Sequence, residues 1–299
     1  MGIPVSAPTS RVLDVLELLS QPGAERLRFS DIARELGLTQ GTANAILGTL
    51  AERGWVERDP VDKRYAIGGG LALLAVRAEA GRTLANQAAA ASRELAEETG
   101  MLVNLAERVG DEIAILTYEG GAPGGLRGSP GDSIPYAPPF GLTFAAWDEP
   151  EGQRAWMERA TLTPAVIAAL DGLLDFTRDR GYSVEWMTEV MAEVAEILPA
   201  LGHAQAGTVS KVMRRVMDGL LLDYIGPESQ HFKTAPDPTT PVIVISAPVF
   251  DQHGRVAYGL TLHPLQPLEP TEIERLGARL TEVCASLAPA GSGQSTGMS

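Results

Sequence analysis

The segment over residues 30–54 constrains the fold more than any other part of the chain, because it carries two helix patterns separated by a glycine turn. The first predicted helix starts at Ser30, a residue favoured at helix N-caps, and ends at Gly37. Thr39 is an equally good cap for a second helix, which Gly54 ends. The apolar positions of the second helix recur on one face, at Ala43, Ile46, Leu47 and Leu50. So short a connection predicts two helices that pack across one another.

The flanking segments extend this pair to a complete small domain. A further helix is predicted over residues 9–19, and two short β runs at residues 55–58 and 64–67 enclose the turn at 59–63. Helix, helix, glycine turn, helix and hairpin is the order of a winged helix-turn-helix, which we assign to residues 5–68. In that fold the third helix projects by its polar face and fits the major groove of DNA.

The candidate DNA contacts lie on the exposed face of the third helix and on the hairpin. Gln and Asn can form two hydrogen bonds with adenine edges, glycines permit close backbone approach, and basic residues on a wing reach phosphates. The candidates are Thr39, Gln40, Gly41, Thr42, Asn44, Arg58, Lys63 and Arg64. The third helix has no Lys or Arg between Thr39 and Leu50. The alternative is therefore a winged helix that serves dimer packing or contact with another protein.

Charge is distributed unevenly along the 299 residues, which hold 24 Lys and Arg against 38 Asp and Glu and have a net charge of -14. Such acidity excludes a general nucleic-acid coat and a polybasic membrane binder. Residues 1–68 hold eight basic and nine acidic side chains, so this block is close to neutral. Any contact with DNA is therefore expected through a local patch.

Two strings of the amino-terminal block carry a family resemblance: RVLDVL at residues 11–16 and SDIARELGLTQGTANAILGTLAERGWVERDPVDKRYAIG at residues 30–68. They resemble the DNA-binding domain of IclR-type bacterial transcription regulators. That family usually has an arginine where Ala45 stands here, and Lys-Ser or a similar pair near Gln40 and Gly41. Both differences bear on the target sequence and the affinity. The resemblance implies a regulator that binds a double-stranded DNA operator as a homo-oligomer, a dimer or a tetramer.

The rest of the chain predicts an α+β domain with an antiparallel sheet, as in a GAF-like effector domain. After a linker helix at residues 69–82, we assign this domain to residues 83–288. Its expected elements are a helix at 83–99, a hairpin of 101–108 with 112–118, a helix at 163–180, a strand at 182–185, a hairpin of 241–250 with 256–262, and a last helix. Thr163 with Pro164 marks one helix start, and a capping box of Thr271 with Glu274 marks the last.

The resemblance also implies an effector pocket in this domain. Its positions would be Phe140, Gly141, Val244, Ser246, Thr261 and His263. Backbone N–H groups of a helix start beside Phe140 and Gly141 suit a carboxylate, and a plain structural turn is the alternative. His263 can donate to an anionic ligand or be a structural histidine with its own partners. The expected ligand is an organic acid or an aromatic metabolite.

The segment 187–240 is longer than the family's short connection. It predicts two amphipathic helices, at residues 188–198 and 208–224, and we treat it as a helical insertion. It can cover the pocket, extend the dimer interface, or replace ligand sensing. The tail at residues 289–299 is small and polar, and we expect it to be disordered.

Several function classes are excluded by what the sequence lacks. Cys284 is the one cysteine, so no internal disulfide can form and no Cys/His metal site is expected. A reduced, cytoplasmic location follows, without signal peptide or membrane span. No nucleophile elbow, P-loop or dinucleotide fingerprint is present, so we expect no enzyme and no cofactor. The leading hypothesis is a transcription regulator that senses a small molecule. The alternative is a regulator that uses its effector domain and insertion for protein–protein interaction.

Overall fold

The structure, a computed structural model, describes residues 6–21, 26–79, 82–121, 129–160, 162, 164–187 and 238–287. The chain divides into two compact units, residues 1–82 and 83–299, each with its own hydrophobic core. The helices expected at 188–198 and 208–224, the tail at 289–299 and the predicted cap Thr163 lie outside the described residues.

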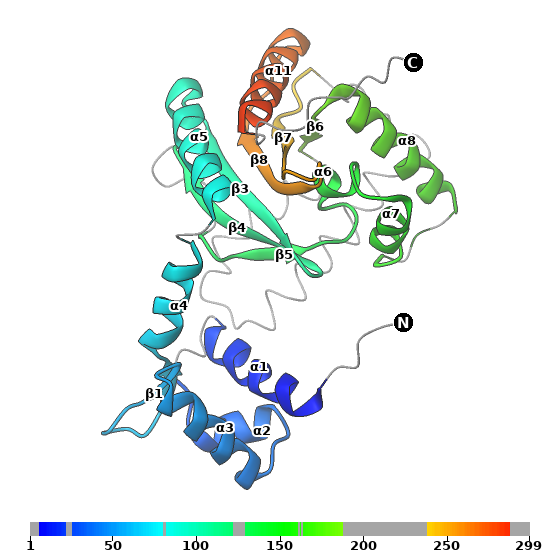
Figure 1. Ribbon diagram of the computed structural model, residues 1–299. Helices are drawn as coiled ribbons and strands as arrows, with labels where there is room; N and C mark the ends of the chain where they lie inside the picture. The colour runs from blue at the N-terminus through cyan, green and yellow to red at the C-terminus, as the bar shows by residue number, and fades with distance from the viewer. Residues whose placement is uncertain are drawn as a thin grey trace, which may run out of the picture. The chain divides into compact units, whose positions relative to one another are not determined.

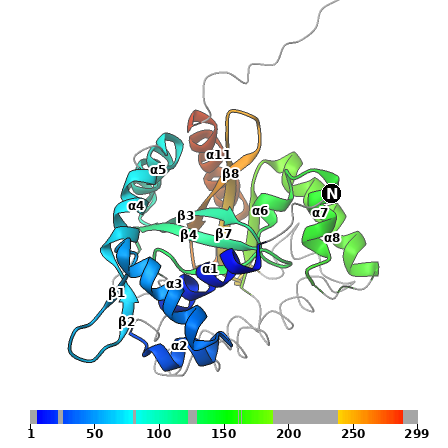
Figure 2. The same cartoon turned by 60° about the horizontal axis from the view of Figure 1, so that its bottom comes forward.

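The first unit consists of helices and a two-stranded hairpin, whose loop projects at the edge of the unit (Figure 2). Its elements are α1 (Ala7–Ser20), α2 (Phe29–Glu35), α3 (Gln40–Glu52), β1 (Val56–Arg58), β2 (Tyr65–Ile67) and α4 (Gly69–Glu79). The two strands are antiparallel, with Val56 opposite Ile67. The apolar stripes of the helices meet in one core, formed by Val15, Leu18, Leu19, Ile32, Ile46, Leu47, Leu50, Val56 and Tyr65. This order of elements confirms the predicted winged helix-turn-helix.

Of the two predicted helix caps in this unit, one is confirmed and one is wrong. The side-chain oxygen of Thr39 accepts a hydrogen bond from the Thr42 N–H at 3.2 Å, as expected for the cap of α3. Ser30 does not cap α2, because that helix already begins at Phe29 and its N-cap is Arg28. Ser30 therefore lies in the first turn, where the sequence pattern alone does not distinguish it from a cap.

Three glycines hold the start of α4 against the short segment between α3 and β1. The Gly68 N–H donates to the Trp55 carbonyl at 2.8 Å, and the Gly70 N–H donates to the Gly54 carbonyl at 2.8 Å. A Cβ atom at Gly68 would clash with the Gly54 carbonyl oxygen, and one at Gly70 would lie 2.7 Å from the same atom. The close backbone approach therefore requires glycine at both positions.

The second unit is an α+β domain built on one antiparallel sheet (Figure 1). The described strands form a six-stranded sheet in the order β5-β4-β3-β8-β7-β6. In chain order the elements are α5 (Thr83–Thr99), β3 (Leu102–Val109), β4 (Glu112–Glu119), β5 (Ser133–Pro135), α6 (Leu142–Ala145), α7 (Pro150–Met157), α8 (Pro164–Arg180), β6 (Ser183–Trp186), β7 (Val242–Phe250), β8 (Val256–His263) and α11 (Pro270–Leu287). Both predicted hairpins are present, and the fold class is confirmed.

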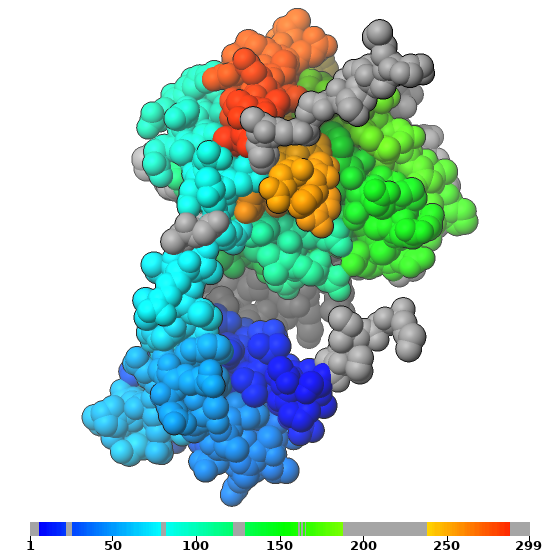
Figure 3. All heavy atoms as spheres, in the orientation of Figure 1, coloured from blue at the N-terminus to red at the C-terminus, as the bar shows by residue number. Residues whose placement is uncertain are grey.

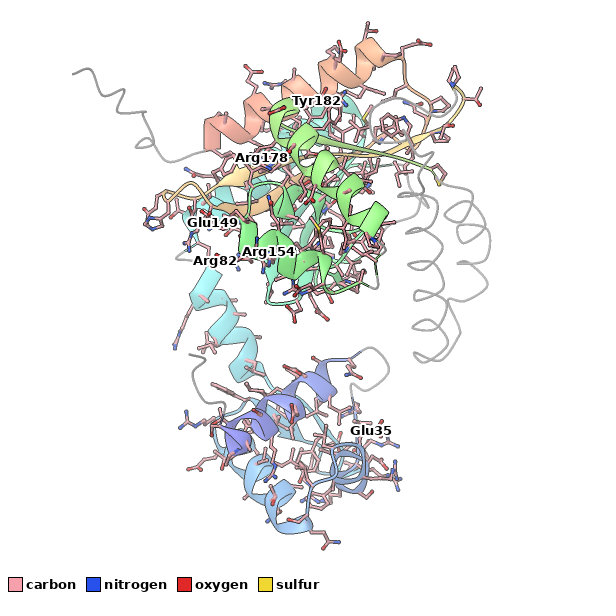
Figure 4. All side chains as sticks on the ribbon, turned by 90° about the vertical axis from the view of Figure 1, so that its right-hand side faces the viewer. Glu35, Arg82, Glu149, Arg154, Arg178 and Tyr182 are labelled. Atoms are coloured by element: carbon pink, nitrogen blue, oxygen red, sulfur yellow. The ribbon has the colours of Figure 1, made fainter. Side chains whose placement is uncertain are left out.

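Each face of the sheet has its own core. Helices α5 and α11 cover one face, where Leu105, Ile245 and Leu260 are fully buried. The second core contains residues of α6, α7 and α8, among them Trp156 and Leu174. Tyr182, labelled in Figure 4, belongs to the first core and packs against α11 where Gly277 leaves room for its ring. The alternation of side chains along the strands thus separates two differently lined surfaces.

The predicted capping box of the last helix is wrong. Helix α11 begins at Pro270, and the N–H groups of Glu272 and Ile273 donate to the Glu269 carbonyl. Thr271 therefore lies inside the first turn, because proline at the first helical position sets the start two residues earlier than a Thr271 cap would. Strand β6 likewise begins at Ser183, one residue after the predicted start. The short elements β5, α6 and α7 lie in a stretch for which no separate strand or helix bounds were predicted.

Candidate functional site

The exposed face of α3 forms an uncharged ridge. Its residues are Gln40, Gly41, Asn44, Ala45, Gly48 and Thr49. The opposite face of the helix is buried through Ala43, Ile46, Leu47 and Leu50. Of the predicted contacts on this helix, Gln40, Gly41 and Asn44 lie on the ridge, whereas half-buried Thr42 shares a 2.9 Å hydroxyl contact with Thr39. The two threonines thus build the helix start, and the ridge presents amide and backbone groups.

The basic side chains of the wing, residues 56–67, are held by contacts within the unit. The Arg64 guanidinium donates to the Arg26 carbonyl at 2.9 Å. The Lys63 ammonium donates to the Pro60 carbonyl at 2.5 Å, and the Arg58 guanidinium lies 5.6 Å from the centre of the Tyr65 ring. The three predicted phosphate contacts are therefore on one hairpin but each has an internal partner.

The tip of the wing is organised by the carboxylate of Asp59. It accepts from the N–H groups of Val61 and Asp62, and it pairs with Arg26 at 2.6 Å. The two backbone hydrogen bonds, followed by Arg26, hold the pKa of Asp59 below its usual value. An ionised Asp59 thus fixes the turn that carries Lys63, whose backbone adopts φ 60°.

A groove of about 510 Å³ runs between α1 and α3 beside the ridge (Figure 3 shows the two segments in dark and lighter blue). Its lining from α1 is Pro8, Arg11 and Val12, and its lining from α3 is Gly41, Thr42, Ala45, Ile46, Thr49 and Leu50. Arg11 is the charged member of this lining. Arg11 was not among the predicted DNA contacts, because it lies on the first helix and outside the helix-turn-helix pair.

A row of buried polar side chains crosses the sheet of the second unit. In register, Asn104 of β3 stands opposite Thr261 of β8, Thr261 opposite Ser246 of β7, and Ser246 opposite Ser183 of β6. The Ser246 and Thr261 hydroxyl oxygens lie 2.9 Å apart. The Ser183 hydroxyl oxygen lies 3.3 Å from that of Thr143 on α6. We call Asn104, Ser183, Ser246 and Thr261 the polar row.

His263 extends the polar row through Nε2, and its other ring nitrogen contacts a backbone carbonyl. Nδ1 lies 3.1 Å from the Ile243 carbonyl oxygen, and Nε2 lies 2.6 Å from the Asn104 side-chain oxygen. Desolvation lowers the pKa of His263 to about 4, against the effect of the Ile243 carbonyl, so the ring is neutral at pH 7. A neutral ring has one N–H, so the second contact requires the Asn104 carboxamide to present its NH₂ group.

Glu185 on β6 lies beside the predicted effector-pocket positions, but it was not predicted from the sequence. It stands opposite Val244, one of the predicted pocket positions, and its carboxylate has no hydrogen bond or ion pair recorded within the described part of the chain. Desolvation raises the pKa of Glu185 to about 7. An acidic residue in a short strand carries no sequence signal for burial, because burial depends on what the fold packs against that strand.

Phe140 and Gly141 have different neighbours from the strand positions. The Trp156 indole N–H donates to the Phe140 carbonyl at 2.8 Å. Gly141 is the N-cap of α6 with φ 86°, and a side chain there would meet the Tyr136 ring. Helix α6 nevertheless reaches the strands through Phe144, which packs over Gly259. The structure therefore brings Ser246, Thr261 and His263 together through the strand register, whereas Phe140 and Gly141 come immediately before α6 and contact Trp156 and Tyr136.

Within the described ranges, no group of three or more His, Cys, Asp or Glu side chains is arranged to hold a metal ion. In the same part of the chain, no helix combines the length and apolar character needed to cross a bilayer. Cys284 is buried, and desolvation raises the pKa of its thiol to about 12.

Comparisons with known proteins agree with this architecture. The family model of the IclR helix-turn-helix domain matches residues 8–60. A glycerol operon regulatory protein of Streptomyces coelicolor is 31% identical over 194 residues, which cover 62% of this chain and 76% of that protein.

Solved structures extend the likeness over both units. An IclR transcriptional regulator from Alicyclobacillus acidocaldarius has a TM-score of 0.65 at 21% identity, covering 95% of this chain and 98% of that one. An IclR homologue from Microbacterium hydrocarbonoxydans, complexed with 4-hydroxybenzoate, has a TM-score of 0.61 at 18% identity, covering 94% and 98%.

Proposed function

Because this chain belongs to the IclR family of DNA-binding transcription regulators, we propose that it binds its operator as a homo-oligomer through α3 and the wing, and that its second unit senses a small molecule. The family consists of transcription regulators rather than enzymes. The observation that carries the DNA-binding mode is the uncharged, exposed ridge of α3.

The ridge suits direct readout of bases in the major groove. Asn44 and Gln40 offer the paired donor and acceptor groups that match an adenine edge. Gly41 and Gly48 have no side chain, and nothing in this unit lies within 4 Å of the place where a Cβ would stand. The α3 backbone can therefore approach the floor of the groove closely. Thr39 and Thr42 contribute by fixing the amino-terminal turn of the helix from which these groups project.

The wing supplies the contacts that position the domain on the duplex. Arg58, Lys63 and Arg64 can direct their charges to phosphates, which carry no sequence information but fix register and orientation. Lys63 and Arg64 donate to the neutral carbonyl groups of Pro60 and Arg26, whereas the exposed ion pair of Arg64 with Asp62, at 3.8 Å, is one that a phosphate would have to displace. We assign the wing to the phosphate backbone beside the groove that α3 occupies.

An exposed apolar helix supports assembly into a dimer. Leu73, Leu74 and Val76 of α4 are 51%, 50% and 67% exposed, and none of the side chains described for this helix is buried. A helix that is apolar around its circumference is normally covered by protein. A second copy of the chain is the partner we propose, since one winged domain makes too few contacts for a specific site and a dimer reads two half-sites.

The polar row is the proposed effector surface. Ser246 and Thr261 offer hydroxyl groups on the face that α6 covers, beside Val244 and His263, and Phe140 and Gly141 lead into that helix. An organic acid or aromatic metabolite is the ligand class we propose. The complex of an IclR homologue with 4-hydroxybenzoate supports this class. Ligand binding would shift the protein between conformations that differ in DNA affinity.

The test begins with DNA. Duplexes enriched by the protein from a random-sequence pool are titrated at several salt concentrations, beside a scrambled duplex of equal length. We expect at least a hundredfold preference for the enriched sequence. No preference at any salt concentration would reject the proposed function. The same titration is then repeated with a panel of organic and aromatic acids, among them 4-hydroxybenzoate, and a change in affinity identifies the effector class.

A second candidate function is a regulator that does not sense small molecules and uses its second unit for protein–protein contact. The observation in its favour is that the Ser246 and Thr261 hydroxyls bond to each other, and that His263 bonds to Ile243 and Asn104. These groups already have partners without a ligand. Unchanged DNA affinity across the whole panel, with sequence-specific binding intact, would favour this function.

A further inference from the structure

In the proposed complex, α3 lies in the major groove of DNA, which is strongly negative. Yet α3 carries no basic side chain from Gln40 to Leu50. Arg11 on α1 lies against this helix. Together with Pro8 and Val12, Arg11 lines the α1 side of the groove between α1 and α3. The α3 side of that groove includes Gly41, Ala45 and Thr49. The cation that α3 lacks is therefore present on the neighbouring helix.

Arg11 is also a basic side chain without a competing partner. Its side chain is exposed, and no hydrogen bond or ion pair is recorded for it within the described residues. Asp14, three residues further along α1, is exposed and makes no recorded pair with it. The wing differs in this respect, because Lys63 and Arg64 each donate to a backbone carbonyl. Nothing in the described structure has to be broken before Arg11 meets an anion.

The diameter of α3 relative to the width of the major groove determines which part of the DNA Arg11 can reach. The major groove is about 12 Å wide, and an α-helix with its side chains is about 10–12 Å across, so α3 fills it. A residue on the adjoining helix then stands at the rim of the groove, where the phosphates lie. Gly41 and Ala45 leave the space in front of Arg11 open, since they add no more than a methyl group.

We propose that Arg11 binds a backbone phosphate at the edge of the major groove that α3 occupies, and so supplies from α1 the charge that α3 itself lacks. This assignment rests on the proposed DNA-binding function and adds a contact outside the helix-turn-helix pair and the wing. A phosphate contact predicts weaker binding to all sequences and a smaller salt dependence when the side chain is removed.

The experiment compares Arg11→Ala, Arg11→Lys and the parent on an enriched duplex and on a scrambled duplex of equal length. Affinities are measured from 50 to 300 mM KCl. We expect Arg11→Ala to lose about tenfold affinity on both duplexes, and the slope of log affinity against log salt to fall by about 0.9 for each chain bound. Arg11→Lys should keep most of the slope because it keeps the charge.

Arg154→Ala is the matched control, since it removes the same charge from the exposed Arg154 of α7 in the other unit (Figure 4). It should bind like the parent, and thermal unfolding should show that the Arg11 variants remain folded. Parent-like affinity and slope for Arg11→Ala would overturn the inference while leaving the proposed function intact. A loss confined to the enriched duplex, with an unchanged slope, would also overturn it, because that result describes a base contact. Failure of the parent to prefer any sequence would instead reject the proposed function itself.

Discussion

Ser246 on β7 and Thr261 on β8 stand directly opposite each other, and their hydroxyl oxygens lie 2.9 Å apart in a buried site. A buried hydroxyl costs less free energy when it has a hydrogen-bond partner, so each of these hydroxyls stabilises the other. The coupling between the two hydroxyls can therefore be measured by protein unfolding, without a ligand.

The losses in unfolding free energy from removing each hydroxyl alone should add up to more than the loss from removing both. Ser246→Ala leaves the Thr261 hydroxyl buried without its partner, and we expect the free energy of unfolding to fall by about 1–2 kcal/mol. Thr261→Val should have a similar effect. The double variant should lose less than the sum, which urea unfolding of all four proteins would measure. Strictly additive losses would mean that the two hydroxyls are not coupled.

Glu185 should make stability decline with pH. Burial raises its pKa to about 7, above the ordinary 4.5, so the folded chain binds this proton more tightly than the unfolded chain. The free energy of unfolding therefore falls as pH rises from about 4.5 to 7. Glu185→Gln should match the parent at pH 4 and be more stable by about 1–3 kcal/mol at pH 8. An equal difference at both pH values in chemical unfolding would contradict this assignment.

Asn44 should govern sequence discrimination. Its side chain is exposed on α3, so Asn44→Ala removes base contacts without disturbing the core. We expect the preference for an enriched duplex over a scrambled one to fall by about tenfold, with an unchanged melting temperature. Thr49→Ser, further along the ridge, is a control that keeps the hydroxyl. Unchanged discrimination in Asn44→Ala would show that another face of the helix reads the bases.

Arg64 should affect DNA binding without regard to sequence. Arg64→Ala should weaken binding to enriched and scrambled duplexes alike and reduce the salt slope. Because Arg64 also donates to the Arg26 carbonyl, we expect a loss of roughly 1 kcal/mol in the stability of the first unit. Salt titrations and thermal unfolding separate the two effects. A change in base preference would be inconsistent with a phosphate contact.

The apolar surface of α4 should control the oligomeric state. Leu73→Glu places a charge on a helix whose neighbours Leu74 and Val76 are also exposed, so it should disrupt a dimer formed there while leaving each core intact. Sedimentation velocity at several concentrations would measure the shift toward monomer. Ala72→Glu, also on α4, shows whether any charge on this helix suffices or whether the leucine position matters. A dimer unchanged by both substitutions would place the interface elsewhere.

Local sequence patterns predicted the first unit well, because capping residues and glycines mark the ends of its helices. Thr39 caps α3 by a hydrogen bond three residues away, and Gly37 and Gly54 adopt positive φ at the predicted helix ends. Errors arose where two local signals competed. Ser30 and Thr271 are both good caps, yet α2 and α11 begin at Phe29 and Pro270.

The polar row could be predicted only in part. Ser246 and Thr261 were expected together from the family resemblance, and the strand register joins them. Asn104 and Glu185 were missed, because their proximity depends on how β3 and β6 align with strands far away in the chain. Arg11 was missed for a similar reason: its position beside α3 arises from helix packing, which no spacing along the sequence encodes.

The glycines at the start of α4 have a consequence for how this chain can change through mutation. Every single-codon replacement of glycine adds at least one carbon atom, and at Gly68 and Gly70 even that atom meets the Gly54 carbonyl. These two positions therefore offer no conservative alternative. A saturation library should be depleted there as severely as in the core, although neither residue has a side chain to contribute.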